Sequence, residues 1–343
     1  MSVMRDDFHL LSVIEVNRET RDSVSIALDV PPALRNEFSY QPGQFLIIQL
    51  ELADRRILRC YSLCSSPHDP EPLRIAVKRV NDGVASNALC GNLKAGDQLA
   101  VQRPAGRFIP KSLDEDLLLI AGGSGITPIL SILKAALVKG RGAITLIYAN
   151  RDEQSVIFRD VLSDLVARHA ERLCVIHWLE SVQGLPSTDK IRGLLAPFAL
   201  RDVFICGPDP FMSAAQEALA LVGARPDCVH LERFASLIDA DVAASPLVEG
   251  APIEAVLQVA IDGDEHVLKW HGGGTMLDAM LAAGLDVPYS CRVGGCSTCM
   301  CRLIAGETQM AINTILTKEE IAEGWVLSCQ ARAITRRVVI EVP

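Results

Sequence analysis

Residues 117–138 read LLLIAGGSGITPILSILKAALV, and this stretch decides the fold of the central part of the chain. Its first five residues form an apolar run of the length of a buried strand, and residues 129–138 carry the pattern of a buried helix. Between them lies a glycine-rich turn, and Pro128 suits the first turn of the helix that follows. Strand, turn and helix predict one half of a βαβ unit, whose parallel strands end beside a ligand.

The same alternation continues downstream. Strands are predicted at 144–150, 173–179 and 202–207, and helices at 156–169 and 210–223. Residues 112–235 are therefore predicted to form an α/β domain with a parallel sheet.

The flanking segments have other patterns. Apolar or alternating runs at 9–16, 23–30, 44–50 and 73–80, separated by Pro-Gly, Asp-Pro and Asp-Gly, predict an antiparallel β-barrel over residues 1–111. The segment 236–253 is rich in small residues, includes Ala and Pro, and contains no basic residue. Such a composition is typical of an interdomain linker. Residues 254–343 predict a small α+β domain, with a hairpin at 255–270, a helix at 275–284 and a closing strand at 336–342.

Four cysteines in the last domain have a diagnostic spacing. Cys291, Cys296 and Cys299 form C-x4-C-x2-C, and Cys329 follows. This is the spacing of plant-type [2Fe–2S] sites, in which one loop supplies three of four thiolates. Zinc sites prefer paired C-x2-C units, so the gap between the first two cysteines argues against zinc. Cys301 would share a strand face with Cys299, so spacing does not exclude it as a ligand; we interpret it as a buried thiol.

Two loops are candidates for nucleotide binding. The first contains Gly122, Gly123, Ser124, Gly125 and Thr127, where glycines allow a pyrophosphate close to the backbone at a helix N-terminus. The second contains Cys206, Gly207, Pro208 and Met212 after another apolar strand. Either loop could serve only to turn the chain, and Cys206 is either a residue facing a nicotinamide ring or a buried thiol.

Composition excludes several classes of function. The chain has 343 residues, 49% hydrophobic and 22% charged, with a net charge of −9, which argues against nucleic acid as a partner. No apolar run is long enough to span a membrane, and the N-terminus does not resemble a signal peptide. Eleven cysteines then indicate thiols and metal ligands in the cytoplasm rather than disulfides. We expect a monomer.

Further motifs make the resemblance to a family plain. Arg59-Cys-Tyr61-Ser62-Leu63, Pro42-Gly43-Gln44-Phe45 and Pro104-Ala-Gly-Arg-Phe108, together with the two glycine loops, resemble the ferredoxin–NADP reductase superfamily. The resemblance implies that Arg59 contacts a flavin phosphate, that Tyr61 lies along the isoalloxazine and that the Ser62 hydroxyl approaches N5.

The resemblance also implies further FAD contacts. Leu63, the last residue of the flavin signature, is one, and contacts near the pyrophosphate are expected at Val77, Lys78, Val80, Gly83, Val84, Ala85 and Ser86. Phe234 either stacks near the flavin or packs in the core. Ser62 and Cys206 are the candidate catalytic residues.

The domain order implies an electron-transfer chain. A flavin barrel, a nucleotide domain and a β-grasp ferredoxin domain in this order resemble the reductase components of bacterial oxygenases. The most similar sub-group is the reductases of 3-ketosteroid 9α-hydroxylase and phenylacetyl-CoA epoxidase, on motifs such as Tyr148-Ala-Asn150-Arg151-Asp152 and Leu231-Glu-Arg-Phe234. Electrons would pass from NAD(P)H through FAD and [2Fe–2S] to an oxygenase, either a Rieske or a di-iron enzyme. A non-catalytic redox sensor is the alternative from another class.

The nucleotide preference turns on the residues after the second parallel strand. Asn150 and Arg151 are candidate contacts, and Arg151 could hold the 2′-phosphate of NADPH. Asp152 would repel that phosphate and bind a 2′-hydroxyl. The two cues conflict, and the ketosteroid resemblance favours NADH.

Overall fold

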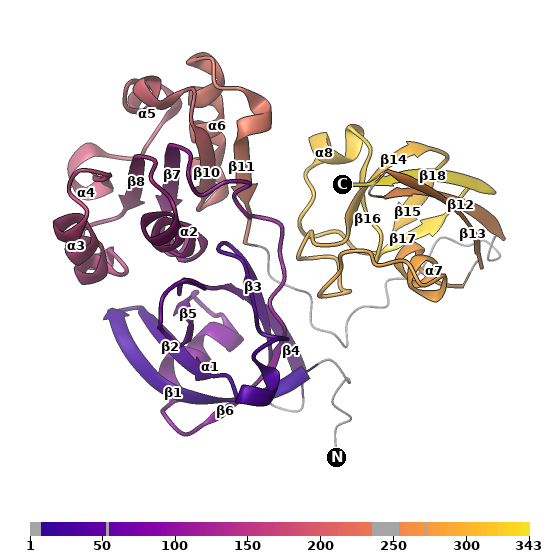
Figure 1. Ribbon diagram of the computed structural model, residues 1–343, viewed down its shortest axis with the longest axis horizontal. Coiled ribbons are helices and arrows are strands. Elements are labelled where there is room, and N and C mark those ends of the chain that lie inside the picture. Colours follow the sequence, from indigo (N-terminus) through magenta and orange to yellow (C-terminus); the bar gives the residue numbers. More distant parts are fainter. Residues whose placement is uncertain (1–7, 53–54, 235–253, 262, 272) are drawn as a thin grey trace. The chain divides into compact units, whose positions relative to one another are not determined.

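The computed structural model describes residues 8–52, 55–234, 254–261, 263–271 and 273–343 (Figure 1). The linker expected at 236–253 lies outside these residues. Backbone contacts divide the chain into two compact units, of which one holds the nucleotide sheet and most of the barrel, and the other holds the C-terminal sheets. No helix in the described residues is long and apolar enough to cross a membrane.

The N-terminal sheet is antiparallel, as the alternating runs predict. Its six strands have the order β4-β3-β6-β1-β2-β5. The Leu63–Ile75 bridge follows edge strand β4 and connects it to edge strand β5, which closes the barrel. The elements are β1 (Phe8–Thr20), β2 (Ser23–Asp29), β3 (Phe45–Leu52), β4 (Arg55–Ser62), β5 (Leu73–Lys78), α1 (Val84–Asn92) and β6 (Gln98–Gln102).

The central sheet is parallel, in the order β11-β10-β7-β8-β9. Alternate residues of β7 enter different cores: Leu117 and Leu119 pack with α2 and α3, whereas Leu118 and Ile120 pack with α5 and α6. The elements are β7 (Leu117–Gly122), α2 (Ile126–Lys139), β8 (Ile144–Asn150), α3 (Arg159–Arg168), β9 (Leu173–Leu179), α4 (Glu180–Gln183), α5 (Thr188–Leu195), β10 (Asp202–Cys206), α6 (Asp209–Leu221) and β11 (Val229–Glu232).

The prediction of a helix over 156–169 was wrong at its start. Helix α3 begins at Arg159, because Phe158 has a left-handed backbone with φ of +61°. Val156, Ile157 and Phe158 instead enter the core from a turn. Their apolar character reports burial, and it does not distinguish a helix from a turn.

The C-terminal part has a main sheet in the order β13-β12-β18-β14-β16 and a small β15-β17 pair. A capping box between Thr275 and Asp278 starts α7, as a Thr three residues before an Asp favours. The elements are β12 (Ala255–Ile261), β13 (Asp264–Trp270), α7 (Met276–Ala282), β14 (Met300–Ala305), β15 (Thr308–Met310), α8 (Lys318–Ala322), β16 (Trp325–Leu327), β17 (Ala331–Ala333) and β18 (Arg337–Val342).

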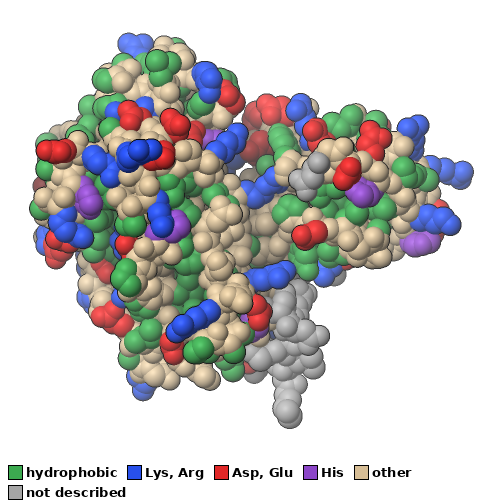
Figure 2. Space-filling model, in the orientation of Figure 1, with side chains coloured by type: hydrophobic (Ala, Val, Ile, Leu, Met, Phe, Trp, Pro, Cys, Tyr) green, Lys and Arg blue, Asp and Glu red, His purple; other side chains and the backbone are tan. Residues whose placement is uncertain are grey.

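The mixed α/β and antiparallel sheets confirm the predicted fold class. His177 and His230 are strand residues of β9 and β11. On the face shown in Figure 2, acidic and basic side chains are interspersed.

Candidate functional site

The two glycine loops meet at the switch point of the parallel sheet. From β7 the chain proceeds to β8 and β9 on one side, and it then returns to place β10 on the other side. Ala121 and Cys206 are register partners at the carboxyl ends of β7 and β10, so the loops that follow them are adjacent. Parallel α/β sheets bind ligands at this point.

Glycine is required where the two loops touch. A Cβ on Gly125 would lie 2.1 Å from the carbonyl oxygen of Cys206, and one on Gly122 would lie 2.9 Å from the Pro208 and Phe211 side chains. The loops therefore pack backbone to backbone, and this leaves a cradle that a phosphate can approach. Thr127 Oγ1 donates to Ser124 O at 3.1 Å and Tyr148 Oη donates to Gly123 O at 3.0 Å, which fix the turn.

Asn150 supports a polar ligand at the same edge. It ends β8 and is 4% exposed, and within the described part of the chain neither its Nδ2 nor its Oδ1 has a partner with hydrogen-bond geometry. A buried amide without partners costs free energy unless a ligand satisfies it. The residues of this edge thus fit a dinucleotide. Met212, also expected to contact the nucleotide, packs in the core between α6 and the sheet.

The barrel brings Ser62 to the nucleotide loops. Ser62 ends β4 and is 4% exposed, and its Oγ donates to Glu232 Oε2 at 3.3 Å. Glu232 ends β11 and is the register partner of Cys206. The two expected catalytic residues, Ser62 and Cys206, are therefore joined through a carboxylate that sequence reasoning did not select. Its sequence signal is its place in Leu231-Glu-Arg-Phe234, one of the motifs that carry the family resemblance.

The surroundings of Glu232 and Cys206 raise the pKa of both side chains. Burial raises the pKa of Glu232 to about 8, and the hydrogen bond from Ser62 partly offsets that effect. Burial, followed by the nearby Glu232 carboxylate, raises the pKa of the Cys206 thiol well above its usual value. Cys206 is thus an uncharged thiol at neutral pH, and Glu232 changes charge close to it.

The residues expected to hold FAD lie on β4, β5 and α1. Arg59 Nη1 donates to the carbonyl of its neighbour Leu58 at 2.8 Å. Gly83 is the N-cap of α1, and no side chain of the described residues caps that end, so its N–H groups can face an anion. The Ser86 hydroxyl instead holds its own loop, where it accepts from Val80 N and donates to Gly83 O.

The other FAD candidates differ in exposure. Leu63, Val77 and Ala85 are buried, and Val80 and Val84 are exposed. Lys78 lies near the first nucleotide loop, because a Cβ on Gly123 would be 3.7 Å from its Nζ. Phe234 is 49% exposed, which excludes the alternative that it packs in the core. The barrel and α1 thus offer an open helix N-terminus and a cation to a flavin pyrophosphate.

The four cysteines of the C-terminal domain are buried together in and beside one loop. Each is at most 8% exposed. The Cys291 thiol donates to the Cys296 sulfur, which lowers the pKa of Cys296 to about 6, and the Cys299 thiol likewise lowers the pKa of Cys329. No three metal-binding side chains in the described residues converge on one ion. A two-iron cluster does not require that, because each iron takes two thiolates.

The loop backbone also fits a cluster. Gly294 has φ of +76°, and a Cβ there would lie 2.7 Å from the Ile312 carbonyl oxygen. Val293 N donates to Cys291 Sγ at 3.4 Å, and Gln330 Nε2 donates to Cys329 Sγ at 3.7 Å. Such N–H groups stabilise thiolate charge. Cys301 is 1% exposed and its thiol contacts Met276 Sδ at 3.7 Å, which confirms its burial.

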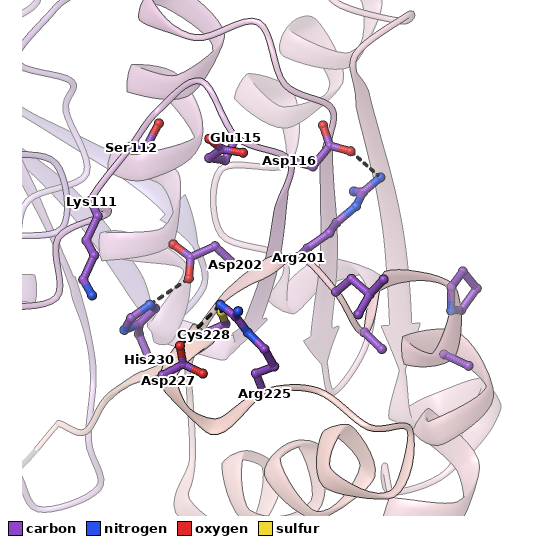
Figure 3. Close-up of a pocket in the computed structure, with 14 residues that line it drawn as sticks. Lys111, Ser112, Glu115, Asp116, Arg201, Asp202, Arg225, Asp227, Cys228 and His230 are labelled. Carbon is purple, nitrogen blue, oxygen red and sulfur yellow. Dashed lines mark hydrogen bonds and ion pairs between the residues drawn. The ribbon is translucent and has the colours of Figure 1, made fainter.

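A separate cavity of about 660 Å³ lies at the amino-terminal ends of the parallel strands (Figure 3). It is beside the amino ends of β7, β10 and β11, away from the glycine loops. Charged groups in its wall pair with one another: His230 Nε2 with Asp202 at 2.8 Å, and Arg201 Nη2 with Asp116 at 3.6 Å. These pairs satisfy much of the charge in its lining without a ligand.

Comparisons with known proteins assign three parts of the chain to domain families. Residues 10–109 match the oxidoreductase FAD-binding domain family, residues 119–217 the oxidoreductase NAD-binding domain, and residues 259–333 the 2Fe-2S iron-sulfur cluster binding domain. A solved structure of phthalate dioxygenase reductase shares the fold, with a TM-score of 0.59 and 23% identity over 98% of both chains.

Two curated relatives match along their full length. The ferredoxin reductase component of 3-ketosteroid-9-alpha-monooxygenase from Rhodococcus rhodochrous is 45% identical over 97% of this chain and 96% of the relative. A 1,2-phenylacetyl-CoA epoxidase subunit from Escherichia coli is 34% identical over 97% of each chain. The chain is therefore an oxidoreductase that passes electrons from NAD(P)H through FAD to a [2Fe–2S] cluster, and the sensor alternative is set aside. It belongs to the family of flavin- and iron–sulfur-containing reductase components of oxygenases.

Proposed function

We propose that this protein is the NADH-dependent reductase component of an oxygenase of the 3-ketosteroid 9α-monooxygenase type. The observation that carries the redox part is the meeting of Ser62 from the barrel with Glu232 and Cys206 at the switch point. The identity of the oxygenase rests on the full-length similarity to the ketosteroid reductases.

Each group would be held by residues already placed. The backbone of Gly122–Gly125, with Asn150 and Cys206–Gly207, holds the nucleotide. Barrel residues from Arg59 to Leu63, with Lys78 and the start of α1, hold FAD. Cys291, Cys296, Cys299 and Cys329 would hold the cluster.

The chain supplies position and electrostatics. FAD, when bound, supplies the conversion of a hydride into single electrons, which is the cofactor's own chemistry. Ser62 Oγ is a hydrogen-bond donor fixed at the end of a strand. The small, uncharged side chain of Cys206 provides a surface against which the nicotinamide ring can pack. Glu232 Oε2 accepts from the Ser62 hydroxyl and orients it, and the Glu232 carboxyl group is protonated below about pH 8.

This arrangement predicts a pH dependence set by Glu232. Burial raises its pKa to about 8, so the carboxyl is neutral below that pH and ionised above it. Ionisation would place negative charge where a hydride must enter, so the rate of flavin reduction by NADH should fall above pH 8. In Glu232→Gln, which stays neutral, the rate should vary little between pH 7 and 9. Stopped-flow flavin bleaching across this range measures it, and an unchanged alkaline fall in the variant would contradict the assignment.

A coupled assay tests the function itself. Anaerobic NADH should bleach both the flavin and the cluster absorbance of the purified protein, and addition of a ketosteroid 9α-oxygenase with its steroid should yield hydroxylated product. A protein without bound flavin, or one that NADH does not bleach, would contradict the redox proposal. Turnover with a di-iron epoxidase and none with the steroid enzyme would contradict only the choice of partner.

A further inference from the structure

Arg151, the residue that could hold a 2′-phosphate, already has an anionic partner from the barrel. Its Nη2 lies 3.0 Å from Oδ2 of Asp22, in the turn between β1 and β2. Asp22 and Arg151 belong to the same compact unit, so this contact lies within a single body. The two residues are 129 positions apart in sequence.

Asp22 is held in place from its other side. Thr20 Oγ1 donates to Asp22 Oδ1 at 2.8 Å, and the Asp22 carbonyl accepts from Arg79 N at 2.7 Å. The Asp22 side chain is 22% exposed, whereas that of Arg151 is 53% exposed. The barrel thus fixes the Asp22 carboxylate, and the more exposed guanidinium of Arg151 pairs with it.

Asp152, whose carboxylate follows Arg151 in the sequence, accepts hydrogen bonds from Ser155 instead of pairing with Arg151. Its Oδ1 accepts the Ser155 hydroxyl at 2.6 Å, and its carbonyl accepts from Ser155 N at 3.1 Å. These contacts close the turn that follows β8. The conflict between Arg151 and Asp152 therefore does not decide the nucleotide, because the anion bound by Arg151 is Asp22.

The charged groups around Asp22 and Arg151 show what loss of the Asp22 charge would do. Lys78 is near enough to Arg21, Arg151, Asp22 and Asp152 for the charge of each to affect its pKa. Three cations and two anions leave a net charge of +1. Loss of the Asp22 charge would make it +2 and would release a guanidinium, the group best suited to bind a phosphate in a bidentate manner.

We propose that Asp22 is a specificity-determining residue that excludes NADPH, because it occupies Arg151 and repels a 2′-phosphate. This inference rests on the proposed nucleotide site, at whose edge Arg151 follows Asn150. Because the Arg151 side chain is 53% exposed, its ion pair with Asp22 should stabilise the fold little, and loss of the pair should change ligand choice more than folding.

The test is the ratio of kcat/KM for NADPH to that for NADH, with ferricyanide as acceptor and the full-length protein loaded with FAD. In Asp22→Asn we expect this ratio to rise at least about tenfold, since a charge-assisted hydrogen bond contributes about that factor. Adding Arg151→Ala to that variant should abolish the gain, and Asp22→Glu should keep the native ratio. The competitive inhibitor 2′-phospho-AMP should bind Asp22→Asn more tightly than the native protein.

Glu15→Gln is the matched control. Glu15 Oε2 pairs with Arg74 Nη2 at 2.6 Å on the same barrel, and its loss should leave the ratio unchanged. If Asp22→Asn has a lowered melting temperature, the same ratio is measured in Asp22→Ser, because a serine hydroxyl can keep the hydrogen bond with Thr20. A ratio within about twofold of native in the Asp22 variants, or an equal rise in Glu15→Gln, overturns the proposal. Failure of NADH to reduce the native protein would instead overturn the proposed function.

Discussion

Replacement of Cys329 by alanine is expected to stop electron delivery to one-electron acceptors while the flavin still oxidises NADH. The variant should lose the visible absorbance of the cluster. Its reduction of cytochrome c or of an oxygenase should fall by at least about 100-fold, because even changes outside a metal's ligand set cost up to that factor. NADH-dependent reduction of ferricyanide, which can take electrons directly from a flavin, should persist.

Cys301→Ala is the control for this experiment. Both cysteines are nearly inaccessible, but the Cys301 thiol contacts Met276 in the core of the domain. Its removal should cost some stability and leave the cluster spectrum intact. If Cys301→Ala lost the cluster and Cys329→Ala kept it, the ligand assignment made from the C-x4-C-x2-C spacing would be wrong.

Ser62→Ala is expected to slow flavin reduction by NADH about 100-fold, by analogy with the cost of removing one preorganised hydrogen-bond donor from an oxyanion hole. The physical reason is the position of its hydroxyl, which is buried at the end of β4 and aligned by Glu232. Alanine keeps the backbone and the packing volume, so FAD content should not change. Single-turnover stopped-flow traces of the flavin absorbance would measure the rate, and flavin content is read from the same spectrum.

A second buried serine of the same loop region provides the comparison. Ser66 is 1% exposed, and its Oγ accepts from His68 N at 3.1 Å within a surface turn. Ser66→Ala should lower the melting temperature by a few degrees at most and leave the hydride rate unchanged. A similar rate loss in both serine variants would indicate a general disturbance of the barrel and would remove Ser62 from the catalytic set.

The fold was predictable because its signals are local. Short apolar runs followed by glycine turns and helical patterns are enough to indicate parallel strands, and most element positions agree with the structure. The error at Val156–Phe158 shows the limit, since a run of buried residues does not reveal the backbone conformation that buries them.

By itself, the sequence determined the fold class and the set of cysteines proposed as cluster ligands. Three of the four cysteines lie within nine residues of one loop, Cys291–Cys299, where chain geometry alone keeps them together. Only the tertiary structure decided what surrounds the nucleotide. Ser62 and Glu232 are 170 positions apart, and Asp22 and Arg151 are 129 apart. Such pairs form because the barrel packs against the carboxyl edge of the parallel sheet, and no local pattern records which side chains that packing brings into contact.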